Sequence, residues 1–90
     1  MKSHIKYTQI VQQYITPLLY NHRKFDIRIW ILWNGSSRQA WWYQEGYIRT
    51  SSREFTLNNT NKFIHLTNDA IQCEAEDFGR YEPANKLSFN

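Results

Sequence analysis

The sequence has few of the residues that mark several classes of protein. Among 90 residues there are one cysteine, two prolines and three glycines. Cys73 cannot form an internal disulfide and lacks the cysteine and histidine neighbours of a zinc site, so a reducing compartment is the default expectation. No segment approaches the run of about 18 apolar residues that a membrane span needs, and no apolar stretch follows Met1 as in a signal peptide. We therefore expect neither a membrane protein nor a secreted one.

Aromatic residues, in contrast, are abundant. The chain holds 4 Trp, 6 Tyr and 5 Phe, and its 41% hydrophobic and 21% charged residues are typical of a globular protein rather than a disordered one. A chain of this length buries only about two-thirds of its unfolded surface. Some of the rings should therefore lie at an edge, against a ligand, a partner or further polypeptide.

The net charge of +3 is unevenly distributed. Residues 1–53 carry eight lysines and arginines against two acids, a net charge of +6, whereas residues 54–90 carry three against six, a net charge of −3. A basic half suits phosphate or an acidic partner, although ordinary solvated surface charge gives the same composition.

Hydrophobic periodicity predicts a mixed α+β unit built around one antiparallel hairpin. The odd positions from Phe25 to Trp33 are all apolar, and Asn34-Gly35 is the strongest short signal for a hairpin turn. Residues 36–38 should lengthen the loop. The hairpin should pair about residues 24–33 with 40–49. The segment 10–15 favours a strand, although its spacing also fits a helix. An Asn-rich loop (55–61), a short strand (63–66) and a helical turn through Ile71, capped by residue 67, 68 or 69, complete the prediction.

Three charged residues alternate along the first strand of this hairpin. Lys24, Asp26 and Arg28 share the face opposite Phe25, with side chains about 7 Å apart. Such a row could grip a polyphosphate with its metal, or a substrate carboxylate. Ion pairs within and between strands are the alternative interpretation.

Few other residues suggest chemistry. Arg49 ends the second strand beside three hydroxyl residues and could hold a carboxylate or phosphate in a bidentate fork, although exposed strand-end arginines are common. His65 is of a kind more often structural than catalytic. The sequence shows no glycine-rich phosphate loop, catalytic triad or metal-ligand spacing, and nothing near Cys73 would activate a thiol.

Several motifs, in order, resemble those of the tubulin tyrosine ligase-like family. They cover nearly the whole chain and are Gln12-Gln13-Tyr14-Ile15, Arg23-Lys24-Phe25-Asp26-Ile27-Arg28, Glu45-Gly46-Tyr47-Ile48-Arg49-Thr50-Ser51-Ser52, His65-Leu66-Thr67-Asn68, Ile71-Gln72 and Phe78-Gly79-Arg80-Tyr81-Glu82 with Asn85-Lys86-Leu87-Ser88-Phe89.

The resemblance implies a fold and an activity. The family has an ATP-grasp fold, so the α+β hairpin would be part of that fold and residues 1–90 part of a catalytic domain. Its members join glutamate, glycine or tyrosine to tubulin. ATP phosphorylates the acceptor carboxylate with the help of Mg²⁺, and the incoming amine attacks the acyl-phosphate.

The resemblance also assigns roles to individual residues. Arg28 would be catalytic, and Arg49 would hold the carboxylate of the free amino acid. Residues expected to bind ATP are Gln12, Tyr14, Ile15, Lys24, Asp26, Thr67 and Asn68, with Asp26 and Arg28 orienting the nucleotide, metal or acyl-phosphate. The implied partner is the tubulin C-terminal tail, in the cytoplasm, on the microtubule cytoskeleton or in a cilium.

Departures from the family pattern leave alternatives open. Asp69, Ala70 and Cys73 replace residues usual in glutamate-adding members, so the added amino acid is not assigned. The family's upstream phosphate-binding lysine and glycine-rich loop, and its downstream Mg²⁺ ligands, are absent from this sequence. We expect a fragment or truncated gene product that is inactive by itself. The alternatives are a non-enzymatic remnant and a basic, aromatic nucleic-acid binder, which the absence of any nucleic-acid motif weakens.

Overall fold

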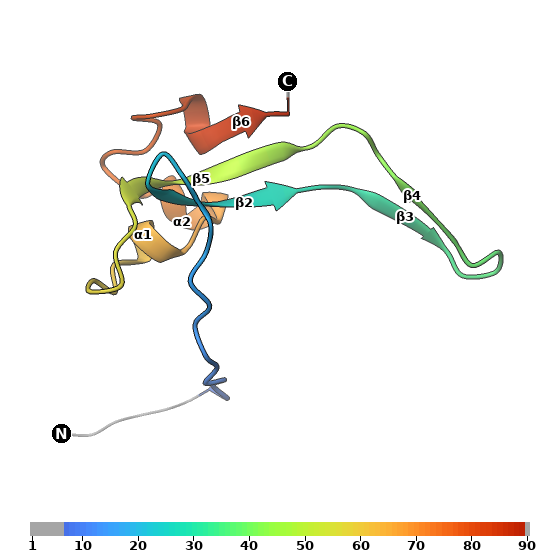
Figure 1. Cartoon of the computed structure of the whole chain (residues 1–90), viewed down its shortest axis with the longest axis horizontal. Coiled ribbons are helices and arrows are strands. Elements are labelled where there is room, and N and C mark those ends of the chain that lie inside the picture. The colour runs from blue at the N-terminus through green and yellow to red at the C-terminus, as the bar shows by residue number, and fades with distance from the viewer. Residues whose placement is uncertain (1–6, 90) are drawn as a thin grey trace.

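The computed structural model describes residues 7–89, which form two antiparallel sheets (Figure 1). The larger sheet has the strand order β1-β2-β5-β6, and the smaller one pairs β3 with β4. The strands are β1 (Leu19–Tyr20), β2 (Arg23–Arg28), β3 (Ile31–Asn34), β4 (Gln39–Trp42), β5 (Tyr47–Glu54) and β6 (Lys86–Ser88).

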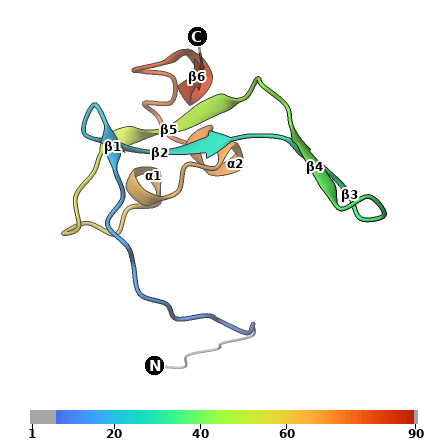
Figure 2. The ribbon, with the colours of Figure 1, turned by 45° about the vertical axis from the view of Figure 1, so that its right-hand side comes forward.

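Three short helices lie between β5 and β6 in the described part of the chain. Helices α1 (Lys62–His65) and α2 (Asp69–Gln72) both contact β5, and Figures 1 and 2 show them together on one side of the β2–β5 pair. The 3₁₀ helix η1 (Pro83–Asn85) leads directly into β6. The α+β class predicted from the sequence is therefore confirmed.

The predicted hairpin is antiparallel, as expected, but it is divided into two parts. Strand β2 pairs with β5, and β3 pairs with β4, while residues 29–30 and 43–46 lie outside the strands. The two continuous strands predicted over about 24–33 and 40–49 are thus wrong, because each is interrupted. Gly46 explains the break, because a Cβ there would lie 2.3 Å from the carbonyl oxygen of Arg28. The chain bends where only glycine allows this close approach of two backbones.

The turn of the hairpin follows Asn34, as predicted, and is longer than a two-residue type I′ turn. Four residues, 35–38, connect β3 to β4. The residue with a left-handed backbone is Arg38, with φ 53°, not Gly35. The Asn34 side-chain oxygen accepts hydrogen bonds from the backbone N–H groups of Ser36 and Ser37, at 3.1 and 3.4 Å. This local bonding offers the backbone an alternative to the tight turn.

Two further strand predictions are wrong. Residues 10–15 belong to no helix or strand and lie exposed, because no neighbouring strand pairs with them. Residues 63–66 fall mostly in α1, where the Asn61 side chain accepts a hydrogen bond from the Phe63 N–H at 2.8 Å. This N-cap favours a helical turn over an extended segment. The loop at 55–61 and the helical turn at α2, preceded by Asn68, are confirmed.

The arm formed by β3 and β4 projects away from the rest of the molecule (Figure 1). Its tryptophans are exposed, with Trp33 at 62% and Trp42 at 66%, so the alternating apolar face is not buried within residues 7–89. The expectation that some rings lie at an edge is confirmed. The Cα radius of gyration, 16.8 Å, exceeds the roughly 12 Å typical of a compact domain of this length, which reflects the arm and the extended residues before β1.

The buried interior is unusually polar. Among the described residues, the only buried hydrophobic side chains are Ile64 and Ala75, whereas eight buried residues are polar or charged. Hydrogen bonds between side chains, rather than apolar packing alone, therefore join β2, β5, α2 and η1. No helix within residues 7–89 is long and apolar enough to cross a bilayer.

Candidate functional site

Asp26 and Arg49 form a bidentate ion pair across the central strands. The register of β2 and β5 sets them directly opposite each other. Arg49 donates from Nε to Asp26 Oδ1 at 2.8 Å and from Nη2 to Oδ2 at 2.6 Å. Thr67, which follows α1, donates from Oγ1 to the same Oδ2 at 2.7 Å. Three residues predicted separately from the sequence thus meet at one carboxylate.

The surroundings of Asp26 determine its charge. Burial would raise the pKa of Asp26, but the hydrogen bonds from Arg49 and Thr67, with the charges of Arg49 and Arg28, lower that pKa below its usual value. The same carboxylate raises the pKa of Arg49. Asp26 therefore stays ionised at neutral pH and fixes the orientation of the Arg49 guanidinium. The cross-strand ion pair, an alternative left open by the sequence, is present.

Lys24 is the second polar centre on this face. Its Nζ donates to the backbone carbonyl oxygen of His65 at 2.9 Å and to the Tyr14 hydroxyl at 3.2 Å. The Tyr14 ring lies below the ammonium, with Nζ 5.0 Å from the ring centroid. An ammonium has three N–H donors, so these two contacts leave one donor for a ligand.

A surface hollow of about 310 Å³ adjoins Lys24. It is lined by Gln12, Gln13, Tyr14, Ile15 and Lys24, so it gathers four of the residues that the resemblance assigned to ATP. A hollow lined by backbone, amides, a ring and one ammonium has the chemistry to take a planar base and a phosphate group. The turn between β1 and β2 folds Lys24 back against residues 12–15, which lie 9 to 12 positions earlier in the sequence.

The two remaining predicted residues, Asn68 and Arg28, make no side-chain hydrogen bond to the Asp26 cluster among the described residues. Asn68 caps α2 through its backbone carbonyl, which accepts from the N–H groups of Ile71 and Gln72 at 3.0 and 2.9 Å. Arg28, at the end of β2, is exposed and acts on Asp26 through its charge. The structure therefore joins Asp26, Arg49 and Thr67 in one cluster and leaves the Arg28 side chain directed to a more open surface.

A second bidentate pair, which we did not assign from the sequence, lies beneath the strands. Arg23 is 2% exposed and donates from Nη1 and Nη2 to the two carboxylate oxygens of Glu82, at 2.8 and 2.5 Å. Thr50 Oγ1 also donates to Glu82, and the Arg23 guanidinium stacks 4.1 Å from the centroid of the Tyr81 ring. Burial would raise the pKa of Glu82, but the hydrogen bonds from Arg23 and Thr50 and the charge of Arg23 lower it.

This buried network continues through two amides. Gln72 Oε1 accepts from the Ser52 N–H and hydroxyl at 3.0 and 2.7 Å, and Gln72 Nε2 donates to the Leu66 carbonyl at 2.6 Å. Asn85 Nδ2 donates to the Thr50 carbonyl and to Ser52 Oγ at 3.1 and 2.8 Å. The network fixes β5 against α2 and η1. The signal that could have revealed it is the run of three hydroxyl residues, 50–52, on consecutive positions of a strand that should alternate.

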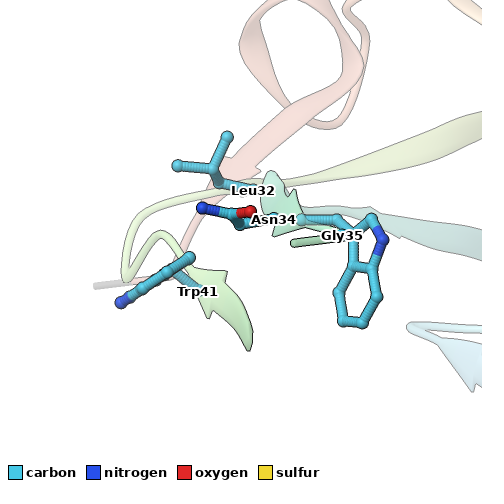
Figure 3. Close-up of a pocket in the computed structure, with 5 residues that line it drawn as sticks. Leu32, Asn34, Gly35 and Trp41 are labelled. Atoms are coloured by element: carbon cyan, nitrogen blue, oxygen red, sulfur yellow. The ribbon is translucent and has the colours of Figure 1, made fainter. Parts of the chain in front are cut away.

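Metal ligands do not gather in the described part of the chain. Across residues 7–89 no group of three His, Cys, Asp or Glu side chains could hold a metal ion. Another hollow, at the tip of the arm, is lined by Leu32, Asn34, Gly35 and Trp41 among others, and contains none of the predicted site residues (Figure 3).

Comparison with known proteins decides the family. Residues 1–88 match the Tubulin-tyrosine ligase family. The chain belongs to this family. The resemblance carried by the ordered motifs is therefore confirmed over almost the whole of the sequence.

The relatives of this chain are named as glycylases and a probable polyglutamylase, two of them of tubulin. Tubulin glycylase 3D of Tetrahymena thermophila is 45% identical over 78 residues, covering 81% of this chain and 7% of the relative. A protein monoglycylase of Homo sapiens is 46% identical over 67 residues, covering 70% of this chain and 8% of the relative. A probable tubulin polyglutamylase of Bos taurus is 39% identical over 72 residues, covering 77% of this chain and 16% of the relative. The chain thus spans less than a fifth of the length of these relatives.

Proposed function

We propose that this chain is part of the catalytic region of a ligase that joins an amino acid to tubulin in an ATP-dependent reaction. Two observations support the proposal. The chain belongs to the tubulin-tyrosine ligase family, and its relatives are named tubulin glycylases and a polyglutamylase. The observation that carries it is the hollow beside Lys24, which collects residues 12–15 and an available ammonium donor.

The fold around this hollow suits the nucleotide-binding face of an ATP-grasp domain. The base would lie against Gln12, Tyr14 and Ile15. The His65 carbonyl oxygen holds the Lys24 ammonium in place. Lys24 would donate its third N–H to a phosphate oxygen. When bound, ATP supplies the phosphoryl group that activates the acceptor carboxylate on the tubulin tail.

Arg49 has the donors needed for an amino-acid substrate. Its Nε and Nη2 contact Asp26, so Nη1 and the outer edge of the guanidinium can donate to the carboxylate of a free amino acid. Asp26 acts as the group that orients this fork, and Thr67 orients Asp26. Arg28, exposed on the same strand face, would stabilise the negative charge of the acyl-phosphate.

The Asp26 carboxylate is poorly suited to bind Mg²⁺. Both oxygens of Asp26 already accept hydrogen bonds from Arg49, and Oδ2 accepts a third from Thr67. Three of the four lone pairs of this carboxylate are thus occupied and its charge is offset by Arg49, so Asp26 is a poor ligand for Mg²⁺. We therefore assign Asp26 to positioning and derive no step through a metal at this cluster.

The test is incorporation of labelled glycine, glutamate or tyrosine into tubulin by the complete protein that contains this chain. We expect incorporation with ATP and none without it. Lys24→Ala should raise the KM for ATP by about 10- to 100-fold, because a hydrogen bond to a charged group contributes about 1.5–3 kcal/mol. Lys86→Ala is the matched control for the KM for ATP, since Lys86 pairs with Asp69 at 2.8 Å and is not among the residues that line the hollow beside Lys24.

The outcome distinguishes the ligase from its alternatives. A wild-type protein that incorporates no amino acid with ATP would contradict the proposal and favour a non-catalytic member of the family. Microtubules and cilia are where such activity would be sought, because the acceptor is tubulin.

A further inference from the structure

The segment before β1 contacts the body of the molecule through one aromatic side chain. Residues 7–18 belong to no helix or strand. Ile10, Val11 and Ile15 are 84, 98 and 82% exposed, whereas Tyr14 is 45% exposed. The Tyr14 ring lies edge-on to the His65 ring, with centroids 5.5 Å apart, and is tilted against Phe55 at 6.4 Å. Tyr14 is therefore the anchor of this segment.

Hydrogen bonds fix which atom of His65 faces Tyr14. His65 Nε2 lies 2.6 Å from the carbonyl oxygen of Asn59, and a carbonyl can only accept, so Nε2 carries the proton. In a neutral imidazole Nδ1 is then an acceptor. It lies 3.0 Å from the Tyr14 hydroxyl, which donates to it. The Tyr14 oxygen accepts in turn from Lys24 Nζ at 3.2 Å.

These contacts form a chain of hydrogen bonds, here called the relay, in which each group donates to the next. It runs from Lys24 through the Tyr14 hydroxyl to His65 and ends at the backbone carbonyl of Asn59. The Tyr14 hydroxyl and the Phe55 ring lie against the imidazole, and the Lys24 ammonium from β2 contacts the His65 backbone carbonyl. Lys62, on the same helix as His65, pairs with Glu74.

We propose that His65 is a positioning residue that holds Tyr14, and with it residues 12–15, in place to receive the nucleotide base. This inference rests on the proposed function, because it names the nucleotide as the ligand of the hollow beside Lys24. Nδ1 acts as the acceptor that orients the Tyr14 hydroxyl. His65 itself touches neither the base nor the reacting atoms.

Two substitutions of His65 separate the halves of the relay. Asparagine carries Oδ1 on Cγ, at the place where the imidazole carries Nδ1, so His65→Asn retains an acceptor for Tyr14. Glutamine carries its amide one bond farther out, near the place of Nε2, so His65→Gln retains the donor for Asn59 and loses the acceptor. Tyr14→Phe removes only the hydroxyl and leaves the ring against Phe55. Tyr7→Phe is the matched control, because Tyr7 lies in the same segment and is 80% exposed.

The first measurement is independent of activity. Chymotrypsin cleavage after residue 14 in the complete protein requires the ring to leave its site, so its rate follows the open population. We expect Tyr14→Phe and His65→Gln to speed this cleavage by about 2- to 13-fold, the factor that one net hydrogen bond supplies. His65→Asn and Tyr7→Phe should cleave at the wild-type rate. Peptides with the sequences of residues 7–20 correct for the intrinsic rates of tyrosine and phenylalanine.

The second measurement is the kinetics of ATP use in amino-acid incorporation. Tyr14→Phe and His65→Gln should raise the KM for ATP by the same factor with little change in kcat, and His65→Asn should restore it. A fall in kcat at constant KM, or His65→Asn resembling His65→Gln, would overturn the positioning role. So would wild-type cleavage rates in all variants.

The two proposals can fail separately. If the cleavage pattern is as expected but the wild type shows no ATP-dependent incorporation, the relay stands and the proposed function fails. If the wild type is active and no variant changes the KM for ATP or the cleavage, the relay fails and the function stands. Should the His65 variants not fold, Tyr14→Phe alone decides, because it removes one exposed oxygen.

Discussion

Replacing Arg49 by lysine should separate amino-acid use from ATP binding in the complete protein. The structure gives Arg49 a fixed direction, because two of its donors hold the two oxygens of Asp26 at 2.8 and 2.6 Å. The guanidinium edge that remains presents a planar donor to a substrate carboxylate. A lysine keeps the positive charge but offers a point charge without a fork.

The expected fall in kcat/KM for the amino acid follows from the hydrogen bonds that Arg49→Lys removes. Lysine cannot hold both oxygens of Asp26 and a substrate carboxylate in the same plane, so at least one charge-assisted hydrogen bond to the substrate is lost. Such a bond contributes about 1.5–3 kcal/mol, which corresponds to a fall of about 10- to 100-fold in kcat/KM for the amino acid. The KM for ATP should change by much less, since Lys24 and residues 12–15 are untouched.

The assay is steady-state incorporation into tubulin at varied amino-acid concentration and saturating ATP. Arg53→Lys is the matched control, because Arg53 lies on the same strand, is partly exposed and pairs with Asp77 at 3.4 Å. Arg53→Lys should leave both KM values near those of the wild type. If Arg49→Lys left amino-acid kinetics unchanged, Arg49 would be a structural partner of Asp26 and not a substrate-binding residue.

Three further outcomes concern stability. Glu82→Gln should lower the free energy of unfolding by about 3–5 kcal/mol, because it leaves the buried Arg23 without its charged partner; thermal or urea unfolding measures the loss. The pKa of Glu82 is lowered by folding, so the stabilisation it contributes is complete at neutral pH and is lost as the pH falls through that lowered value. The difference between wild type and Glu82→Gln should therefore shrink below pH 4.5, the ordinary pKa of the group, and a difference that grew there would contradict the ion pair. Gly46→Ala should destabilise by about 1–3 kcal/mol, because its Cβ would lie 2.3 Å from a backbone oxygen; Gly35→Ala, whose Cβ would lie 3.6 Å from its nearest neighbour, should be tolerated.

The sequence by itself determined the features that depend on local order along the chain. The alternation around Lys24, Asp26 and Arg28 predicted a strand and its polar face, and the loop at 55–61 and the helical turn after Asn68 followed from local residue preferences. The order of the motifs identified the family before any geometry was known. These properties need only neighbours in sequence, so a linear pattern records them.

Only the tertiary structure decided which of these residues meet. The register of β2 and β5 made Asp26 and Arg49 partners, and the position of Tyr14 over Lys24 and His65 depends on contacts between residues 10 to 51 positions apart. The break at Gly46 likewise follows from a close approach of two backbones that periodicity does not record. The helical form of residues 62–65, in contrast, has a local cap at Asn61 that the strand prediction did not take into account. The buried pair of Arg23 and Glu82, like the break at Gly46, was hidden from periodicity. Charged residues are expected on the surface, and only the packed fold supplies the partner that makes their burial favourable.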